Sequence, residues 1–224
     1  MFNFLKRKVV AKILCPHCSS ELEQAPSRKT KCKKCSQYIY VRTNPHDEQR
    51  ILVTEAEAQK IDELWKVEAS HSRWIRTVKD MGATDEDIQK TKDALRAQFG
   101  FEPPFRDIIW SLFNEFSKRG DMPYYTMALF LDEEGRDPSK MLAIDSEMKL
   151  KQLKAMRVVK TVKIVSAGDQ SCVACKEQAD KVYTIEEATR NPVLPCQNCT
   201  YHMTENSKYG FCRCSYNPEE ISIS

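Results

Sequence analysis

All ten cysteines of the 224-residue chain lie in two short segments. Four form two C-x-x-C pairs in the first segment and six lie in the second: Cys15, Cys18, Cys32, Cys35; Cys172, Cys175, Cys196, Cys199, Cys212, Cys214. A C-x-x-C turn brings two thiolates close together, so two such pairs can surround one tetrahedral zinc ion. The 136 residues between the segments contain no cysteine. The chain is therefore predicted to carry two zinc modules around a cysteine-free middle part, with all ten cysteines as candidate ligands.

The first segment, residues 12–42, has two C-x-x-C pairs separated by 13 residues. Short β-prone runs, 12–14 and 38–41, enter and leave these pairs. The segment resembles a rubredoxin-type zinc ribbon over about 30 residues, and the resemblance implies two hairpins that clamp one ion. A structural zinc is favoured over a redox role because a thioredoxin-like site has a single pair in a βαβ unit.

The net charge of +3 is unevenly distributed along the chain. Residues 1–50 hold 11 basic and 4 acidic residues, residues 51–156 hold 16 and 20, and residues 157–224 hold 8 of each. The densest basic run is in the first segment, beside Tyr38 and Tyr40: Lys29, Lys31, Lys33, Lys34. Such a patch can attract phosphate backbones or an acidic protein surface. Nucleic-acid contacts are expected to begin at these lysines, the simpler alternative being a solvated loop.

The middle part has a helical pattern. Thr54 with Glu57, and Thr84 with Asp87, predict two capping boxes, with a break near 81–82. Residues 103–118 show the strongest apolar periodicity, and a fourth helix through 131, capped by Asp121, and a fifth over about 141–156 are predicted. An apolar stripe that includes Leu64 is expected to be buried, and three tryptophans are expected in the core: Trp65, Trp74, Trp110.

The second cysteine segment follows an alternating run, 158–167, that predicts a strand, and a short strand is expected near 182–183. Six cysteines exceed the needs of one tetrahedral ion. Either Cys172, Cys175, Cys196 and Cys199 close one site with Cys212 and Cys214 nearby, or the first pair joins the C-R-C turn and one of Cys196 or Cys199 is spare. Two zinc ions are predicted for the whole chain. Arg213 is expected to contact an anion or the thiolates.

Three elements of this segment carry a second resemblance: Cys172 with Cys175, the stretch Asp180-Lys181-Val182-Tyr183, and Cys212-Arg213-Cys214. Together they resemble the cysteine knuckle of phage head-morphogenesis proteins of the Mu F type. The resemblance covers some 45 residues and implies a phage or prophage setting.

The predicted fold class is α+β: a central α-helical bundle flanked by a small β-rich zinc ribbon and a C-terminal cysteine-rich zinc module. The predicted domains are 1–50, 51–156 and 157–224. Lys6, Arg7 and Lys8 interrupt the apolar runs of the N-terminus, so no signal peptide or membrane span is expected and a cytoplasmic location is predicted.

The predicted function is a non-enzymatic zinc-binding adaptor that contacts a protein or a nucleic acid. No catalytic residue and no small-molecule substrate is evident from the sequence. The first alternative is a phage-type structural or morphogenesis factor. A metal-dependent nuclease is the second, with His202 or the stretch Glu147-Met148-Lys149 as its candidate elements, but that stretch lies in a helical pattern and His202 has no recognisable partner.

Overall fold

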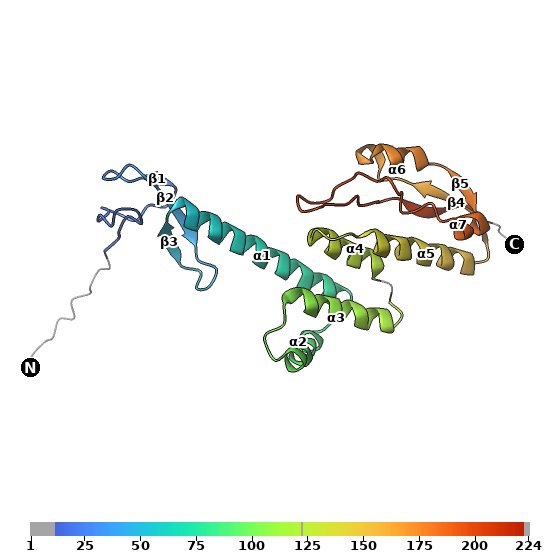
Figure 1. Ribbon diagram of the computed structural model, residues 1–224, viewed down its shortest axis with the longest axis horizontal. Coiled ribbons are helices and arrows are strands. Elements are labelled where there is room, and N and C mark those ends of the chain that lie inside the picture. The colour runs from blue at the N-terminus through green and yellow to red at the C-terminus, as the bar shows by residue number, and fades with distance from the viewer. Residues whose placement is uncertain (1–11, 122, 222–224) are drawn as a thin grey trace, which may run out of the picture. The chain divides into compact units, whose positions relative to one another are not determined.

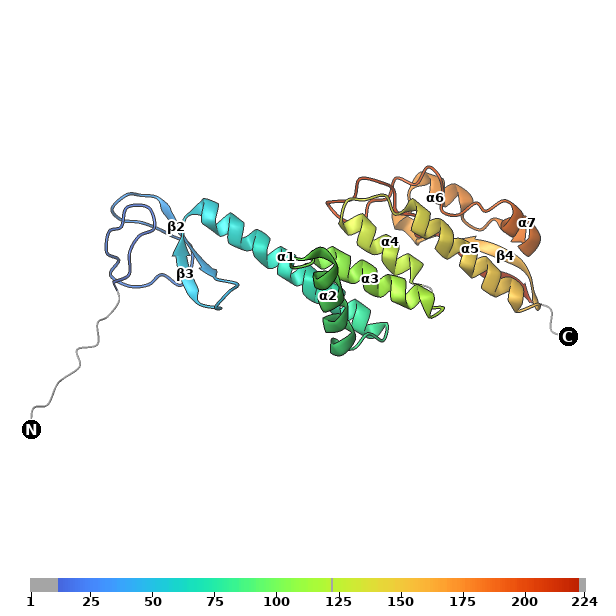
Figure 2. The ribbon, with the colours of Figure 1, turned by 60° about the horizontal axis from the view of Figure 1, so that its bottom comes forward.

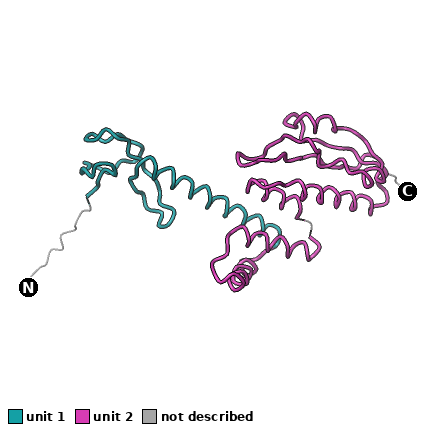
Figure 3. The backbone as a smooth tube through the Cα atoms, in the orientation of Figure 1, with its two compact units in different colours: residues 1–82 teal, residues 83–224 magenta. Residues whose placement is uncertain are grey.

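The computed structural model describes residues 12–121 and 123–221 (Figure 1). This part of the chain combines seven α-helices with two small three-stranded antiparallel sheets. The chain divides into two compact units, residues 1–82 and 83–224 (Figure 3). The predicted helical middle contributes one helix to the first unit and four to the second, so its description as a single bundle, like the three-domain division, stays a prediction.

The first unit contains one sheet and one long helix. The sheet has the order β1-β2-β3, and the helix follows it directly in the sequence: β1 (Thr30–Lys31), β2 (Tyr38–Thr43), β3 (Arg50–Val53), α1 (Glu55–Asp80). Thr54 ends the last strand and begins the helix, because its side chain accepts a hydrogen bond from the Glu57 N–H and the Glu57 carboxylate accepts from the Thr54 N–H. This capping box confirms the sequence prediction.

Polar contacts attach the first turns of α1 to β2. Tyr40 Oη donates to Glu55 Oε1 at 2.6 Å, and Arg42 Nε donates to Asp62 Oδ1 at 2.7 Å. Trp65 Nε1 donates to the carbonyl of Thr43 at 2.9 Å. The prediction that Trp65 lies in the core is therefore wrong: it is 38% exposed, because β2 offers it a backbone acceptor instead of an apolar surface.

The predicted apolar stripe of α1 is correct for only part of the helix. Trp74 and Val78 are 5% and 0% exposed, whereas Leu64 is 47% exposed. Leu64 is in the same region of α1 as Trp65, beside the small sheet, and that sheet buries few apolar side chains. The buried residues of α1 therefore lie near its two ends, Ala58 at the N-terminal end and Trp74 and Val78 toward the C-terminal end.

The second unit begins with four helices and ends with a sheet and two short helices: α2 (Asp85–Phe99), α3 (Phe105–Lys118), α4 (Tyr124–Glu133), α5 (Ser139–Ala155), β4 (Val159–Val165), α6 (Val173–Gln178), β5 (Val182–Thr184), α7 (Ile185–Arg190), β6 (Ser215–Ile221). A 3-10 helix, η1 (Gly168–Gln170), precedes α6. Among the described residues no helix has both the length and the apolar composition of a membrane span. Residues 6–8, which carry the expectation about the N-terminus, lie outside the described residues.

The strongly periodic segment 103–118 forms α3 as predicted, and its apolar face packs on α4. Trp110, Phe113 and Phe130 make three edge-to-face contacts with ring centroids 5.8–5.9 Å apart. The predicted capping of the next helix by Asp121 is wrong. The helix begins at Tyr124, directly after Pro123, whose ring fixes φ near the helical value and whose missing N–H costs nothing at a helix start.

The main core of the second unit lies between α5 and the sheet β5-β4-β6. Leu150 and Leu153 of α5 join Val162 and Ile164 of β4 in one buried cluster, and α5 runs along β4 in both views (Figures 1 and 2). The predicted strands 158–167 and 182–183 correspond to β4 and β5. Strand β6 was not predicted from the sequence, because it contains Pro218 and two glutamates. It lies at the edge of the sheet, where a strand tolerates proline.

The capping boxes give a direct test of local stability. Thr84 accepts a hydrogen bond from the Asp87 N–H at 3.1 Å and donates to its carboxylate at 2.8 Å. Thr84→Ala is expected to lower the free energy of unfolding by about 1 kcal/mol, measured by urea denaturation. Thr84→Ser is the matched control and should retain most of the stability, because it keeps the hydroxyl.

The same capping box should respond to acid. The pKa of Asp87 is lowered because the backbone N–H and the hydroxyl of Thr84 donate to its carboxylate. A lowered carboxyl pKa means that the stabilisation is fully present above the unfolded value of about 3.9 and is lost as the pH falls through the folded value. The stability difference between the native chain and Thr84→Ala should therefore shrink only below about pH 4.

Candidate metal centres

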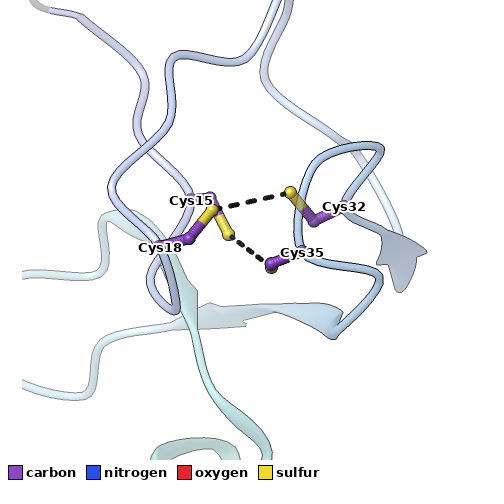
Figure 4. A group of neighbouring side chains, drawn as sticks. All are labelled: Cys15, Cys18, Cys32 and Cys35. Carbon is purple, nitrogen blue, oxygen red and sulfur yellow. Dashed lines mark hydrogen bonds between the residues drawn. The ribbon is translucent and has the colours of Figure 1, made fainter.

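The first unit brings its four cysteines into one group. The four Sγ atoms lie within 4.8 Å of one another. Cys15 Sγ is 3.8 Å from Cys35 Sγ, and Cys18 Sγ is 3.9 Å from Cys32 Sγ (Figure 4). These separations are far longer than the roughly 2.05 Å of a disulfide, and all four thiols are free. The group could hold a metal ion.

Two turns of the same geometry position these sulfurs. In the first, the Ser19 N–H donates to the Cys15 carbonyl, and in the second the Ser36 N–H donates to the Cys32 carbonyl, both at 2.9 Å. Ser19 and Ser36 follow the second cysteine of each pair and have φ of 55° and 60°, in the left-handed region. Each C-x-x-C pair is therefore folded back on itself, so that the two turns present their sulfurs to one another.

Hydrogen bonds favour the thiolate form of two cysteines in this group, Cys18 and Cys32. For Cys35, a hydrogen bond from the Gln37 backbone is outweighed by burial and the neighbouring thiols, which together raise its pKa to about 11. The N–H groups of Cys35 and Lys34 donate to Cys32 Sγ and lower its pKa to about 6. The Ser20 hydroxyl, 3.0 Å from Cys18 Sγ, and the Ser20 backbone lower the pKa of Cys18. Thiolate is the form of cysteine that binds a metal ion.

The four lysines of the basic run have different surroundings. Lys29 Nζ lies over two tyrosine rings, 4.6 Å from the centroid of Tyr38 and 4.4 Å from that of Tyr40. Lys33 Nζ is 3.2 Å from the Glu23 carboxylate. Lys31 and Lys34 are exposed. The run is thus not one uniform positive patch, since two of its four lysines are already engaged within the unit.

The second unit brings six cysteines together from three places. Cys172 precedes α6 and Cys175 lies in it; the remaining four are in the loop after α7 and in the segment that enters β6: Cys196, Cys199, Cys212, Cys214. Four sulfurs form one group that could hold a metal ion: Cys175, Cys196, Cys212, Cys214. A second group consists of Cys172, Cys175 and Cys199. Cys175 belongs to both.

This grouping matches neither arrangement expected from the sequence. The first pair does not face the second pair alone, and Cys199 is not spare, because its Sγ lies 3.8 Å from both Cys172 Sγ and Cys175 Sγ. Cys175 Sγ also lies 3.9 Å from Cys212 Sγ. The physical reason is that α6 begins between Cys172 and Cys175, so the two sulfurs of this pair are displaced along a helix and reach different neighbours.

Hydrogen bonds favour the thiolate form of two of the six cysteines in the second unit. Burial raises the pKa of Cys172, but hydrogen bonds from the backbone of Thr200 and Cys175 and from the thiols of Cys175 and Cys199 together lower it to about 7. The pKa of Cys212 is lowered by the thiols of Cys196 and Cys214, and the Cys196 N–H donates to Cys212 Sγ at 3.2 Å. The pKa values of the other four are raised: Cys175, Cys196, Cys199, Cys214.

Two residues that are not cysteines, Gly210 and Tyr216, help to hold the cysteine loops in place. Neither was predicted from the sequence. A Cβ on Gly210 would lie 1.7 Å from the carbonyl oxygen of Cys199, so only glycine fits there. The buried Tyr216 hydroxyl accepts hydrogen bonds from the N–H groups of Val193 and Leu194 at 3.0 and 3.2 Å, just before Cys196. In the sequence, the glycine two residues before the C-R-C turn was the one sign that the backbone at Gly210 passes close to that of Cys199.

A small space borders both sulfur groups, at Cys172, Cys175 and Cys214. Its volume is about 10 Å³, and Ser171, Cys172, Cys175 and Arg213 are among the residues that line it. Ser171 Oγ and Arg213 Nη2 are buried and have no hydrogen-bond partner among the described residues. The Arg213 guanidinium stacks on Tyr201, with 3.8 Å between its Cζ and the ring centroid. The structure thus places Arg213 beside the cysteine groups, as the sequence indicated.

The two nuclease elements considered in the sequence are not brought together with the cysteines. His202 is exposed and belongs to none of the three groups found among the described residues. Glu147 lies on α5, where its carboxylate forms an ion pair with Lys151 at 2.8 Å.

Comparison of the chain with models of protein families gives no match. Comparisons with curated proteins and with solved structures give none either. The resemblances to a rubredoxin-type ribbon and to phage Mu F-type proteins therefore stay predictions that rest on the quoted residues alone.

Proposed function

We propose that this chain is a non-enzymatic zinc-binding adaptor in which each of two compact units is organised by its own thiolate centre, and whose first unit contacts nucleic acid. The observation that carries the proposal is the presence of one complete four-cysteine group in each unit. Four protein ligands close the coordination sphere of a tetrahedral ion, which is typical of structural rather than catalytic zinc.

The sulfur geometry supports zinc as the metal. A zinc–sulfur bond of about 2.3 Å in a regular tetrahedron places the sulfurs about 3.8 Å apart. The Sγ–Sγ distances of 3.8 and 3.9 Å in both units fit this spacing. Soft thiolate donors in a set of four favour zinc over magnesium or calcium, which prefer oxygen ligands.

Charge supports the choice of nucleic acid as the partner of the first unit. Lys31 and Lys34 are exposed, and together with Lys33 they border a groove of about 300 Å³ beside Cys32, which Glu21 and Glu23 also line. Residues 1–50 carry a net charge of +7, from 11 basic and 4 acidic residues. The exposed ammonium groups of Lys31 and Lys34 suit phosphate oxygens. Lys29 already covers the faces of Tyr38 and Tyr40, so the contact is expected to be with the backbone and not by base stacking.

Salt-dependent binding tests this contact. The native chain is expected to bind short DNA or RNA with an affinity that falls steeply with salt, and Lys31→Gln/Lys34→Gln should reduce the slope of log K against log salt by about 2. The control Lys154→Gln/Lys160→Gln removes two exposed charges from the second unit and should leave the slope unchanged. Absence of binding at low salt would contradict the nucleic-acid assignment and point to an acidic protein partner.

A further inference from the structure

The second unit has six cysteines, and one tetrahedral ion needs only four ligands. All six belong to one or both of two sulfur groups, so none is left outside a possible metal site. Cys175 is 3% exposed and its Sγ is a member of both the four-sulfur and the three-sulfur group. A thiolate sulfur has more than one lone pair and can bridge two metal ions. Cys172 and Cys199 therefore lie where ligands of a second ion would lie, next to Cys175 and outside the four-sulfur group.

We infer that the second unit holds two zinc ions bridged by the Cys175 thiolate, one bound by Cys175, Cys196, Cys212 and Cys214 and the other by Cys172, Cys175 and Cys199. The inference rests on the proposed zinc binding and extends it from two ions per chain to three. It deepens the structural role of the centre without adding a catalytic one.

The spacing of the three sulfurs supports the second ion. Cys199 Sγ is 3.8 Å from both Cys172 Sγ and Cys175 Sγ, the separation expected for neighbouring ligands of tetrahedral zinc. A disulfide between Cys172 and Cys199 would need about 2.05 Å, and both are free. Their arrangement is therefore that of metal ligands, and it repeats the spacing seen in the first unit.

Three thiolates leave one coordination position at the second ion. A space of about 10 Å³, close to the minimum that one water molecule occupies, is lined by Cys172 and Cys175 of the three-sulfur group and by Cys214 of the four-sulfur group. Ser171 Oγ and Arg213 Nη2, which border it, are the buried polar atoms that lack hydrogen-bond partners among the described residues of this region. A zinc-bound water there would satisfy both.

Charge compensation is compatible with two ions. Six thiolates carry −6, and two zinc ions carry +4, which leaves −2; a single zinc ion leaves −4, or −2 if the two remaining thiols stay protonated. Arg213 lies between Cys212 and Cys214 in the sequence and lines the same space as Cys172 and Cys175, where its positive charge offsets part of the remainder.

The zinc-to-protein ratio of the native chain, measured by elemental analysis after purification without added zinc, tests the inference. We expect three ions per chain, and two in Cys172→Ser/Cys199→Ser. The control Cys15→Ser/Cys18→Ser should also retain two, having lost the ion of the first unit. A native ratio of two would overturn the bridged centre while leaving the proposed function intact, whereas a ratio near zero would overturn both.

Cadmium-113 NMR of the exchanged protein tests the bridge itself, and it does so in the native sequence, so that a folding defect in a variant cannot obscure the result. Two of three resonances should be coupled to one another through the shared sulfur. In Cys172→Ser/Cys199→Ser one of these two should disappear and the coupling with it. Three resonances without mutual coupling would contradict bridging by Cys175.

Discussion

Cys32→Ser is expected to unfold residues 12–53 while leaving the second unit folded. The four-cysteine part of the first unit has a very small buried core, centred on Cys15, Cys32 and Ile39. A core of this size cannot stabilise a fold on its own, and a structural zinc ion contributes on the order of 10–16 kcal/mol to the folding of such modules. Removing one of its four ligands should therefore remove most of what holds β1 to β2 and the two turns together.

Nitrogen-15 NMR spectra of the two proteins give the readout. The dispersed amide signals of residues 12–53 should collapse in Cys32→Ser, and those of 83–221 should stay in place. Ser20→Ala is a matched control, because it removes the hydroxyl 3.0 Å from Cys18 Sγ but no metal ligand, and it should keep the native spectrum. A native-like spectrum of Cys32→Ser would mean that the fold of residues 12–53 does not depend on a metal.

Gly210→Ala is expected to disrupt the metal centre of the second unit. The new Cβ would lie 1.7 Å from the Cys199 carbonyl oxygen and 3.3 Å from Cys199 Cβ. Real Cβ atoms do not approach a backbone oxygen so closely, so the segment that carries Cys199 must move away, and with it a sulfur that lies 3.8 Å from both Cys172 Sγ and Cys175 Sγ. A cost above about 3 kcal/mol in unfolding free energy, with loss of bound metal, should follow.

Gly100→Ala provides the comparison for this substitution. Gly100 has φ of +77° and no atom within 4 Å of the position of a Cβ, so alanine there meets backbone strain without a steric clash. Its cost should be about 1–2 kcal/mol, with the metal content unchanged. Equal destabilisation by the two substitutions, or full metal content in Gly210→Ala, would show that the contact with Cys199 does not control the centre.

Local features of the fold were predictable from the sequence because they depend on neighbouring residues. The capping boxes at Thr54 and Thr84, the apolar face of α3 and the strand β4 all follow from spacing within one element. The position of Trp65 was not predictable, since its exposure depends on the carbonyl of Thr43 that it meets on β2. Strand β6 was not predicted because it is a strand only through its pairing with β4, which lies 50 residues or more earlier in the sequence.

The candidate metal ligands could be identified from the sequence, but their grouping in the second unit could not. The first unit has only two C-x-x-C pairs, so their four sulfurs can form only one four-cysteine group. In the second, the partners of Cys175 depend on where α6 begins and on how the loop after α7 approaches β6. Gly210 and Tyr216 set that approach by contacts with Cys199 and with the backbone before Cys196, and neither carries a metal-ligand side chain.

Native mass spectrometry of the chain purified without added metal tests the central claim, that each unit folds around a thiolate-bound zinc ion, most directly. The predicted result is a monomer mass that includes at least one zinc ion for each four-cysteine group. Cys15→Ser/Cys18→Ser should lose the zinc of the first unit only, and Cys196→Ser/Cys212→Ser should lose zinc from the second. A folded chain whose mass shows no metal, or one that carries iron with visible absorption, would contradict the account.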